Sequence, residues 1–214
     1  MSSDPVYASL REAIVAGELQ PNERLIEADL SKHFGFTRAA VRTALLLLEQ
    51  DGLVLREPNR GARVRLIGAE EAIEILEARE ALEGVAARHA ALNATEQDVH
   101  DLREILVRMR NMLDGGDLLG ASDESDTLHA RLAEISRHQT VTRLISMLKS
   151  QTVRFQFRTI LVPGRPEQAF AEHSAIVEAI EARDSEAAER AMRQHLSHIR
   201  ETLRHDRDGR GGRR

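Results

Sequence analysis

The segment Leu25–Val54 constrains the fold more than any other part of the sequence, because its pattern is typical of two short helices separated by a tight turn. Apolar residues recur at helical spacing on both sides of Gly35. Thr37 is a good N-cap for the second helix, which carries Arg38 and Arg42 on one face. In a helix-turn-helix, the start of the second helix meets base edges in the major groove of DNA. The segment therefore predicts a helix-turn-helix.

The regions on either side of this segment predict one further helix and a hairpin. Apolar spacing predicts a first helix over Pro5–Ala16, and two short strands are expected at Leu53–Arg56 and Ala62–Leu66. The turn between the strands contains Arg60 and Gly61, so the hairpin is basic at its tip. A basic hairpin directly after a helix-turn-helix is typical of a wing. Its tip could enter the minor groove, where the potential is negative.

The remainder of the chain shows only helical periodicity. The expected helices are at residues 69–92, 95–113, 117–136, 139–161, 166–182 and 184–205. Short loops make consecutive helices antiparallel neighbours, so we expect a six-helix antiparallel bundle. The fold class is therefore mainly α, with a winged helix-turn-helix followed by an all-α bundle. The expected domains are residues 1–67 for DNA binding, 68–205 for effector binding and dimerisation, and 206–214 as a disordered basic tail.

Composition excludes several classes of protein. The net charge of -5 argues against indiscriminate coating of nucleic acid, although residues 36–65 hold six arginines against three acidic residues. The chain has no cysteine, which excludes disulfides and thiolate metal sites. It contains no apolar run of transmembrane length, and its first residues lack the apolar region of a signal peptide. We therefore expect a cytoplasmic location and no membrane association.

Three of the nine histidines form a pattern of their own. His129, His173 and His195 lie on three separate predicted helices, each among apolar residues. Imidazoles that converge in the core of a bundle would form a nitrogen-donor site suited to zinc or nickel. The alternative is that they are core residues hydrogen-bonded to their neighbours.

The N-terminal third resembles the winged helix-turn-helix of the GntR family of bacterial transcription regulators. The stretches that carry this resemblance are LREAIVAGELQPNERLIEADLSKHFGFTRAAVRTALLLLEQDGLV and the wing PNRGARV. The helical remainder resembles the FCD ligand-sensing domain of the FadR-like branch, through EAREALEGVAARHAA and EHSAIVEAIEARDSEAAERAMRQHL. The resemblance covers residues 6–204, and both halves occur in the order found in the family.

The resemblance implies a set of DNA contacts. The expected contacts are Thr37, Arg38, Ala39 and Arg42 on the second helix, with Arg60 and Gly61 in the wing. This chain departs from the family at Ala40, where proline is frequent, and at Ala28, where some members carry a basic contact. The alternative for the two helix arginines is a solvated surface.

The resemblance also implies that the three histidines are metal ligands, joined in the family by an Asp one helical turn before the first. Here Ser125 is four residues before His129, whereas Asp126 is three residues before it. Residues three apart still share a helix face, so Asp126 is the expected fourth ligand. Ser125, water or the effector could take that position instead, and His198 is a weaker substitute. The expected cofactor is a divalent metal ion, zinc before nickel or manganese.

Arg79 matches a family position that faces the sensor cavity. A guanidinium offers a planar fork for a carboxylate, so Arg79 is expected to bind a small carboxylate effector. The alternative is an intrahelical ion pair with Glu83, four residues on.

The function expected from these observations is that of a ligand-responsive regulator rather than an enzyme. It would bind a palindromic double-stranded operator as a homodimer, as a repressor, with operator affinity controlled by the effector. One alternative is a metal-dependent hydrolase or oxygenase, which would leave the winged domain unexplained. Another is a constitutive DNA binder with an inert dimerisation bundle.

Overall fold

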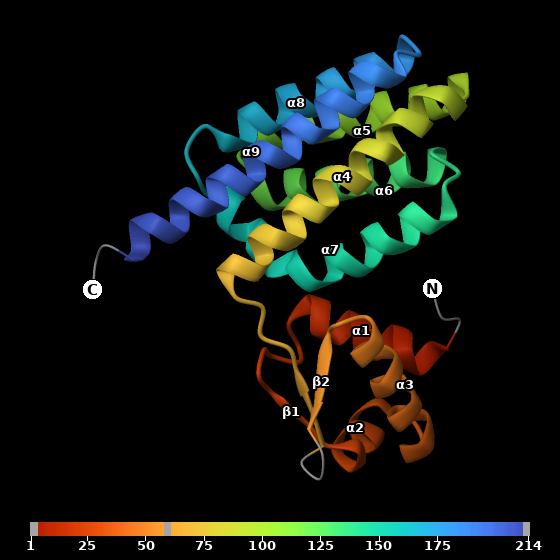
Figure 1. Cartoon of the computed structure of the whole chain (residues 1–214), viewed down its shortest axis with the longest axis vertical. Helices are drawn as coiled ribbons and strands as arrows, with labels where there is room; N and C mark the ends of the chain where they lie inside the picture. The colour runs from red at the N-terminus through yellow and green to blue at the C-terminus, as the bar shows by residue number, and fades with distance from the viewer. Residues whose placement is uncertain (1–3, 58–60, 212–214) are drawn as a thin grey trace. The chain divides into compact units, whose positions relative to one another are not determined.

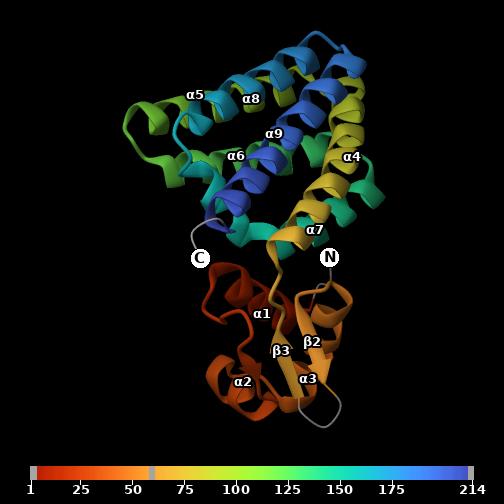
Figure 2. The same cartoon turned by 60° about the vertical axis from the view of Figure 1, so that its left-hand side comes forward.

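The computed structural model describes residues 4–57 and 61–211. The chain divides into two compact units, the first formed by the residues up to Gly68 with residues 149–153, and the second by the remainder. Each unit buries an apolar core of its own. Figures 1 and 2 show the first unit as helices around a small sheet and the second as helices alone. In the part of the chain that is described, no helix is both long and apolar enough to cross a membrane. The predicted fold class, mainly helical with one small sheet, is confirmed.

The first unit combines helices with an antiparallel sheet in the order β1-β3-β2. Its elements are α1 (Pro5–Ala16), β1 (Arg24–Leu25), α2 (Glu27–Phe34), α3 (Arg38–Gln50), β2 (Val54–Glu57) and β3 (Gly61–Val64). The helix and the hairpin expected on either side of the helix-turn-helix are both present. Strand β1 was not predicted, because two residues are too few to show an alternating pattern. It exists because Arg24 pairs with Arg63, and Leu25 with Ala62, on strand β3.

The ends of the first helices follow from capping. The Asp4 carboxylate accepts hydrogen bonds from the first turn of α1, and Gly17 ends this helix with a φ of 81°. Gly35 has a φ of 73° in the turn between α2 and α3, a left-handed conformation that glycine adopts without steric cost. Thr37 then caps α3, because its hydroxyl accepts a hydrogen bond from the Ala40 amide at 3.2 Å. The predicted turn and N-cap are therefore confirmed.

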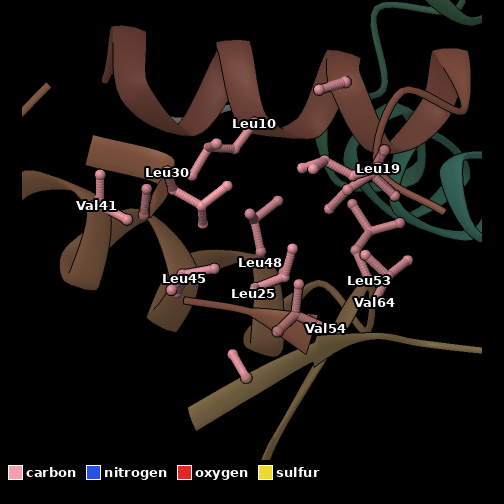
Figure 3. Close-up of a cluster of buried hydrophobic side chains, with 14 of the residues drawn as sticks. Leu10, Leu19, Leu25, Leu30, Val41, Leu45, Leu48, Leu53, Val54 and Val64 are labelled. Carbon is pink, nitrogen blue, oxygen red and sulfur yellow. The ribbon is translucent and has the colours of Figure 1, made fainter. Parts of the chain in front are cut away.

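The core of the first unit lies between α1 and the sheet (Figure 3). Figure 3 shows side chains from helices and strands meeting there, and its labelled members include Leu10, Leu25, Leu48 and Val64. One face of α3 is buried in this core through Val41, Ala44, Leu45 and Leu48. The opposite face of α3 is left exposed on a rigid support.

The second unit contains the predicted helices. They are α4 (Ala69–Asn93), α5 (Glu96–Asp114), α6 (Leu118–Ile135), α7 (Gln139–Ile160), α8 (Arg165–Glu181) and α9 (Ser185–Gly211). The bounds agree with those predicted to within one residue, except at the end of α9. This helix continues beyond residue 205 into the segment expected to be disordered. Charged residues can extend a helix that is already nucleated, even where they have no apolar partner.

Helices α4 and α9 lie side by side along the unit, as Figures 1 and 2 show. Gly84 permits their close approach, because a Cβ at this position would lie 2.8 Å from Cγ of Arg193. The main core is built by buried residues of α4, α5, α6, α8 and α9. Of these helices, α6, α8 and α9 are the ones that carry the three histidines singled out above.

Candidate functional site

The start of α3 presents the predicted DNA contacts to solvent. Thr37, Arg38, Ala39 and Arg42 are all exposed, whereas the residues between and after them that face the core are buried. Arg38 and Arg42 are one helical turn apart. Gly61, at the start of β3, is exposed with a φ of 87°. Arg60 lies outside the described residues.

A surface hollow of about 360 Å³ borders this face of the first unit. Its walls come from β1, α2, α3 and both strands of the wing, and four arginines line it: Arg24, Arg38, Arg42 and Arg56. Arg24 and Arg56 were missed by the sequence analysis. The signal for Arg56 was its place on the wing strand, whereas Arg24 depends on the unpredicted strand β1. The hollow is strongly basic on a chain whose net charge is negative.

One acidic residue shares the hollow with these arginines. The Glu27 carboxylate accepts hydrogen bonds from Nε of Arg42 at 2.9 Å and from Nη2 at 2.7 Å. The hydrogen bond from Arg42 holds the pKa of Glu27 below its ordinary value. The side edge of the Arg42 guanidinium is therefore already occupied by Glu27.

The three histidines predicted as metal ligands meet in the second unit. His129, His173 and His195 are all buried, and each offers a ring nitrogen within 4.8 Å of the others. Nε2 of His129 lies 3.3 Å from Nε2 of His173 and 3.3 Å from Nε2 of His195. Residues separated by up to 66 positions in the sequence thus point the same ring atom at one place.

This arrangement fits a divalent metal ion. Zinc–imidazole bonds are about 2.0–2.1 Å long, so nitrogens at the corners of a tetrahedron lie roughly 3.3–3.4 Å apart. Two of the Nε2 separations have this value. Nitrogen lone pairs that converge in a dry interior repel one another unless a cation or a proton lies between them. The donor set and its spacing could therefore hold zinc, and the same imidazoles suit nickel or manganese.

Glu83 contacts the ring of His129 at Nδ1, the nitrogen that does not face the other two histidines. One carboxylate oxygen lies 2.5 Å from Nδ1 of His129, and the other accepts a hydrogen bond from Nε of Arg79 at 2.8 Å. Burial alone would raise the pKa of Glu83, but Arg79 and His129 outweigh it and hold this pKa well below its usual range. A carboxylate beside Nδ1 fixes the orientation of the ring and directs its Nε2 toward the other two histidines.

Glu172 does the same for His195. Its Oε2 lies 2.7 Å from Nδ1 of His195 and accepts a hydrogen bond from Nη2 of the buried Arg165 at 2.9 Å. Its Oε1 lies 2.7 Å from Nδ1 of His198, so His198 shares this carboxylate and is not one of the three grouped ligands. Burial lowers the pKa of His195 to about 4, although Glu172 opposes the change. His195 is therefore neutral near pH 7, as a metal ligand must be.

His173 differs from the other two histidines. Burial, with His195 and His129 beside it, holds the pKa of His173 well below its ordinary value. Its Nδ1 has no hydrogen-bond partner among the described residues, and its Nε2 lies 3.3 Å from the hydroxyl of Ser125. The grouped ligand atoms come from the histidines and do not include Asp126. Ser125, which makes this contact, lies four residues before His129, a full helical turn.

Sequence reasoning did not single out Glu83, Glu172 or Arg165 as parts of the histidine site. Glu83 was considered only as a partner of Arg79, and that ion pair is present. Glu172 directly precedes His173, and Arg165 lies seven residues earlier on the same face of α8, which was an available signal. Which histidine a carboxylate reaches on another helix depends on packing, which spacing along one helix does not contain.

Comparison with known families assigns both units. Residues 2–64 match the family described as bacterial regulatory proteins, gntR family, and residues 74–198 match the FCD domain. The chain is 31% identical over 199 residues to the HTH-type transcriptional repressor RspR of Escherichia coli K12, and the match covers 93% of this chain and 87% of that protein. It is 29% identical over 209 residues to the Uxu operon regulator of Haemophilus influenzae, which covers 87% of this chain and 74% of that protein.

Solved structures share the fold. Escherichia coli McbR/YncC superposes with a TM-score of 0.78 at 22% identity, covering 96% of this chain and 99% of that one. A GntR family regulator from Pseudomonas syringae gives a TM-score of 0.54 at 22% identity, covering 97% and 86%. These likenesses extend over both units, in the order in which the chain carries them.

Proposed function

We propose that this chain, which belongs to the GntR family of bacterial regulatory proteins and carries an FCD domain, is a ligand-responsive repressor controlled through its histidine cluster. The chain is a DNA-binding transcriptional regulator, not an enzyme. The finer proposal rests above all on one observation, the convergence of three buried Nε2 atoms in the FCD domain.

The winged unit reads the operator in this proposal. Arg38 and Arg42 reach base edges in the major groove, where an arginine bound to guanine through two hydrogen bonds supplies about 1–3 kcal/mol of discrimination. Thr37 and Ala39 contact the backbone and the bases beside them, while Arg60 and Gly61 of the wing approach the minor groove. Support comes from the exposure of the described members of this set around one basic hollow.

The FCD unit binds a divalent metal ion and a small carboxylate effector. His129, His173 and His195 would hold the ion, and Asp126, Ser125 or water would complete its coordination. A bound divalent cation would supply positive charge for the oxygens of a carboxylate. The effector also contacts Arg79, whose Nε donates a hydrogen bond to Glu83 and whose Nη1 and Nη2 have no partner among the described residues. These terminal nitrogens are the end of the fork that suits a carboxylate.

Control of DNA affinity requires two arrangements of the DNA-reading heads. We propose that the chain forms a homodimer, so that two recognition helices meet successive major grooves of a palindromic operator. The effector acts only to the extent that it binds one arrangement more tightly than the other. The name of one relative, a transcriptional repressor, supports repression as the outcome. Such a protein acts in the cytoplasm, where bacterial DNA lies.

The test is operator binding with the metal and the effector varied separately. The operator is the duplex that the wild-type protein selects from a random library, and the effectors are a panel of small hydroxy and keto acids. We expect at least one acid to change the Kd of the zinc-loaded protein about tenfold or more. The effect should be lost in His173→Ala and kept in the control His100→Ala, an exposed histidine of the same unit. No change in Kd with any acid would favour a constitutive binder.

A further inference from the structure

Glu27 lies where a DNA-binding surface would be expected to avoid negative charge. It is the sole acidic residue among the described residues that line the arginine hollow, and Arg24, Arg38, Arg42 and Arg56 surround it. An acidic side chain here weakens the attraction of the surface for phosphates, which supply most of the non-specific affinity for DNA. Its presence therefore calls for a role beyond general electrostatic attraction.

The geometry of the Glu27–Arg42 pair indicates that role. The carboxylate occupies the side edge of the guanidinium, formed by Nε and one hydrogen of Nη2. A guanidinium has five N–H donors in a rigid plane. The end edge, formed by Nη1 and the other hydrogen of Nη2, remains available for two parallel hydrogen bonds. Arg42 can thus keep Glu27 and bind a guanine through O6 and N7 at the same time.

The pair also fixes where that end edge points. Glu27 is the first residue of α2, and Arg42 lies in the second turn of α3, so the pair joins the two helices of the reading head. Arg42 is otherwise a long, exposed side chain with many rotamers, and ordering it on binding costs entropy. Two hydrogen bonds to a carboxylate on another helix restrict the plane of the guanidinium before DNA arrives.

We propose that Glu27 is a positioning residue for specificity. It orients Arg42 so that its end edge meets a guanine, and its charge suppresses binding to DNA that offers only phosphates. The inference rests on the proposed role of Arg42 in reading the operator. Glu27 would thus lower the non-specific affinity for DNA and raise the discrimination at one base pair.

The experiment compares Glu27→Gln with Glu18→Gln. Both variants remove one negative charge from a side chain on the surface of the same unit, but Glu18 contacts the imidazole of His33 and lies outside the hollow. Each protein is titrated with the duplex selected by the wild type and with a scrambled duplex of equal length, at several salt concentrations. Thermal unfolding checks that each variant is folded.

We expect Glu27→Gln to reduce the ratio of specific to non-specific affinity about tenfold. Non-specific affinity should rise, and tolerance of substitution should increase at a single guanine of the selected site. Glu18→Gln should leave the ratio unchanged. In an Arg42→Ala background, Glu27→Gln should cause no further loss of discrimination at that guanine, because the residue it orients is gone.

Two results would overturn the inference. If Glu27→Gln changes specific and non-specific affinity by the same factor, Glu27 acts only as a charge. If its effect on discrimination persists in the Arg42→Ala background, it does not act through Arg42. An Arg42→Ala variant that keeps full operator affinity would instead overturn the proposed role of Arg42, and the inference with it.

Discussion

Each unit contains an arginine–glutamate ion pair, which is exposed to solvent in the winged unit and buried in the FCD unit. Arg42 and Glu27 approach to 2.7 Å on the surface of the winged unit, with side chains that are 61% and 31% exposed. Arg79 and Glu83 approach to 2.8 Å inside the FCD unit, with side chains that are 11% and 3% exposed. The contact distances are almost equal, although the Arg42 pair has two hydrogen bonds and the Arg79 pair has one. The main difference between the two pairs is burial.

Burial determines how strongly the removal of one partner of the pair destabilises the fold. An exposed ion pair contributes little to folding, because water solvates each partner well when the pair breaks. A buried pair also adds little compared with an apolar pair, but removal of one partner leaves a charge in the dry interior. We infer that the surface pair can serve recognition without affecting the fold, whereas the buried pair holds both the fold and the histidine cluster.

The largest effect should come from breaking the buried pair. Glu83→Gln leaves Arg79 without a counter-charge and weakens the contact to His129. We expect the free energy of unfolding to fall by about 3–5 kcal/mol, measured by urea denaturation. A loss below about 1 kcal/mol would show that water reaches Arg79 and that burial does not distinguish the two ion pairs.

The next largest effect should come from the metal. Zinc added to the metal-free protein should raise the unfolding midpoint, because an ion that binds only the folded state at 100 times its Kd stabilises it by about 2.7 kcal/mol. His173→Ala should lose this response, and the control His100→Ala, which is exposed and pairs with Glu104, should keep it. An equal response in the two variants would place the ion elsewhere.

A smaller effect is expected at a partly buried contact of the winged unit. Tyr7 donates a hydrogen bond to Asp51, and burial together with this acceptor raises the pKa of Tyr7 to about 12. Tyr7 is the sole tyrosine and the chain has no tryptophan, so absorbance at 295 nm reports its ionisation directly.

The expected outcome has two parts. Absorbance should rise around pH 12 rather than 10, and Asp51→Asn should move the midpoint part of the way down, because burial remains. Since the folded state keeps its proton longer than the unfolded state, this contact stabilises the fold below pH 10, and its contribution is lost as the pH rises from 10 to 12. A wild-type midpoint near 10 would show that the contact is open to water.

The smallest effect on stability should come from the surface pair. Glu27→Ala and Arg42→Ala should unfold at the wild-type midpoint within experimental error, because both side chains are solvated when the pair is broken. Arg42→Ala should nevertheless weaken operator binding about tenfold or more. A variant that unfolds several degrees early would contradict the contrast with Arg79 and Glu83.

The sequence predicts the parts of this protein that depend on local chemistry. Helix α1, the turn at Gly35 and the cap at Thr37 follow from spacing and capping preferences and are confirmed. The end of α9 was wrong, because a lack of apolar residues does not stop a helix that is already formed. Strand β1 was missed because its pairing partner, β3, is distant along the chain.

The candidate site was likewise predicted from the sequence only in part. The convergence of the three histidines was predicted from their places among apolar residues on separate helices together with the family resemblance, and the structure brings them together. The carboxylates that hold them were not predicted, since Glu83 and His129 are joined only by the packing of α4 against α6. Glu27 was missed for the same reason, because its contact with Arg42 joins two helices. Asp126 as a ligand stays a prediction.

The most direct test of the account is the metal content of the protein, measured by elemental analysis on tag-free wild type and on His173→Ala. The account predicts about one zinc, nickel or manganese ion per chain in the wild type and a loss of that ion in the variant. Absence of metal from both proteins, even after reconstitution with each ion, would contradict it. The three histidines would then be structural, and any effector would have to be held by Arg79 without a metal.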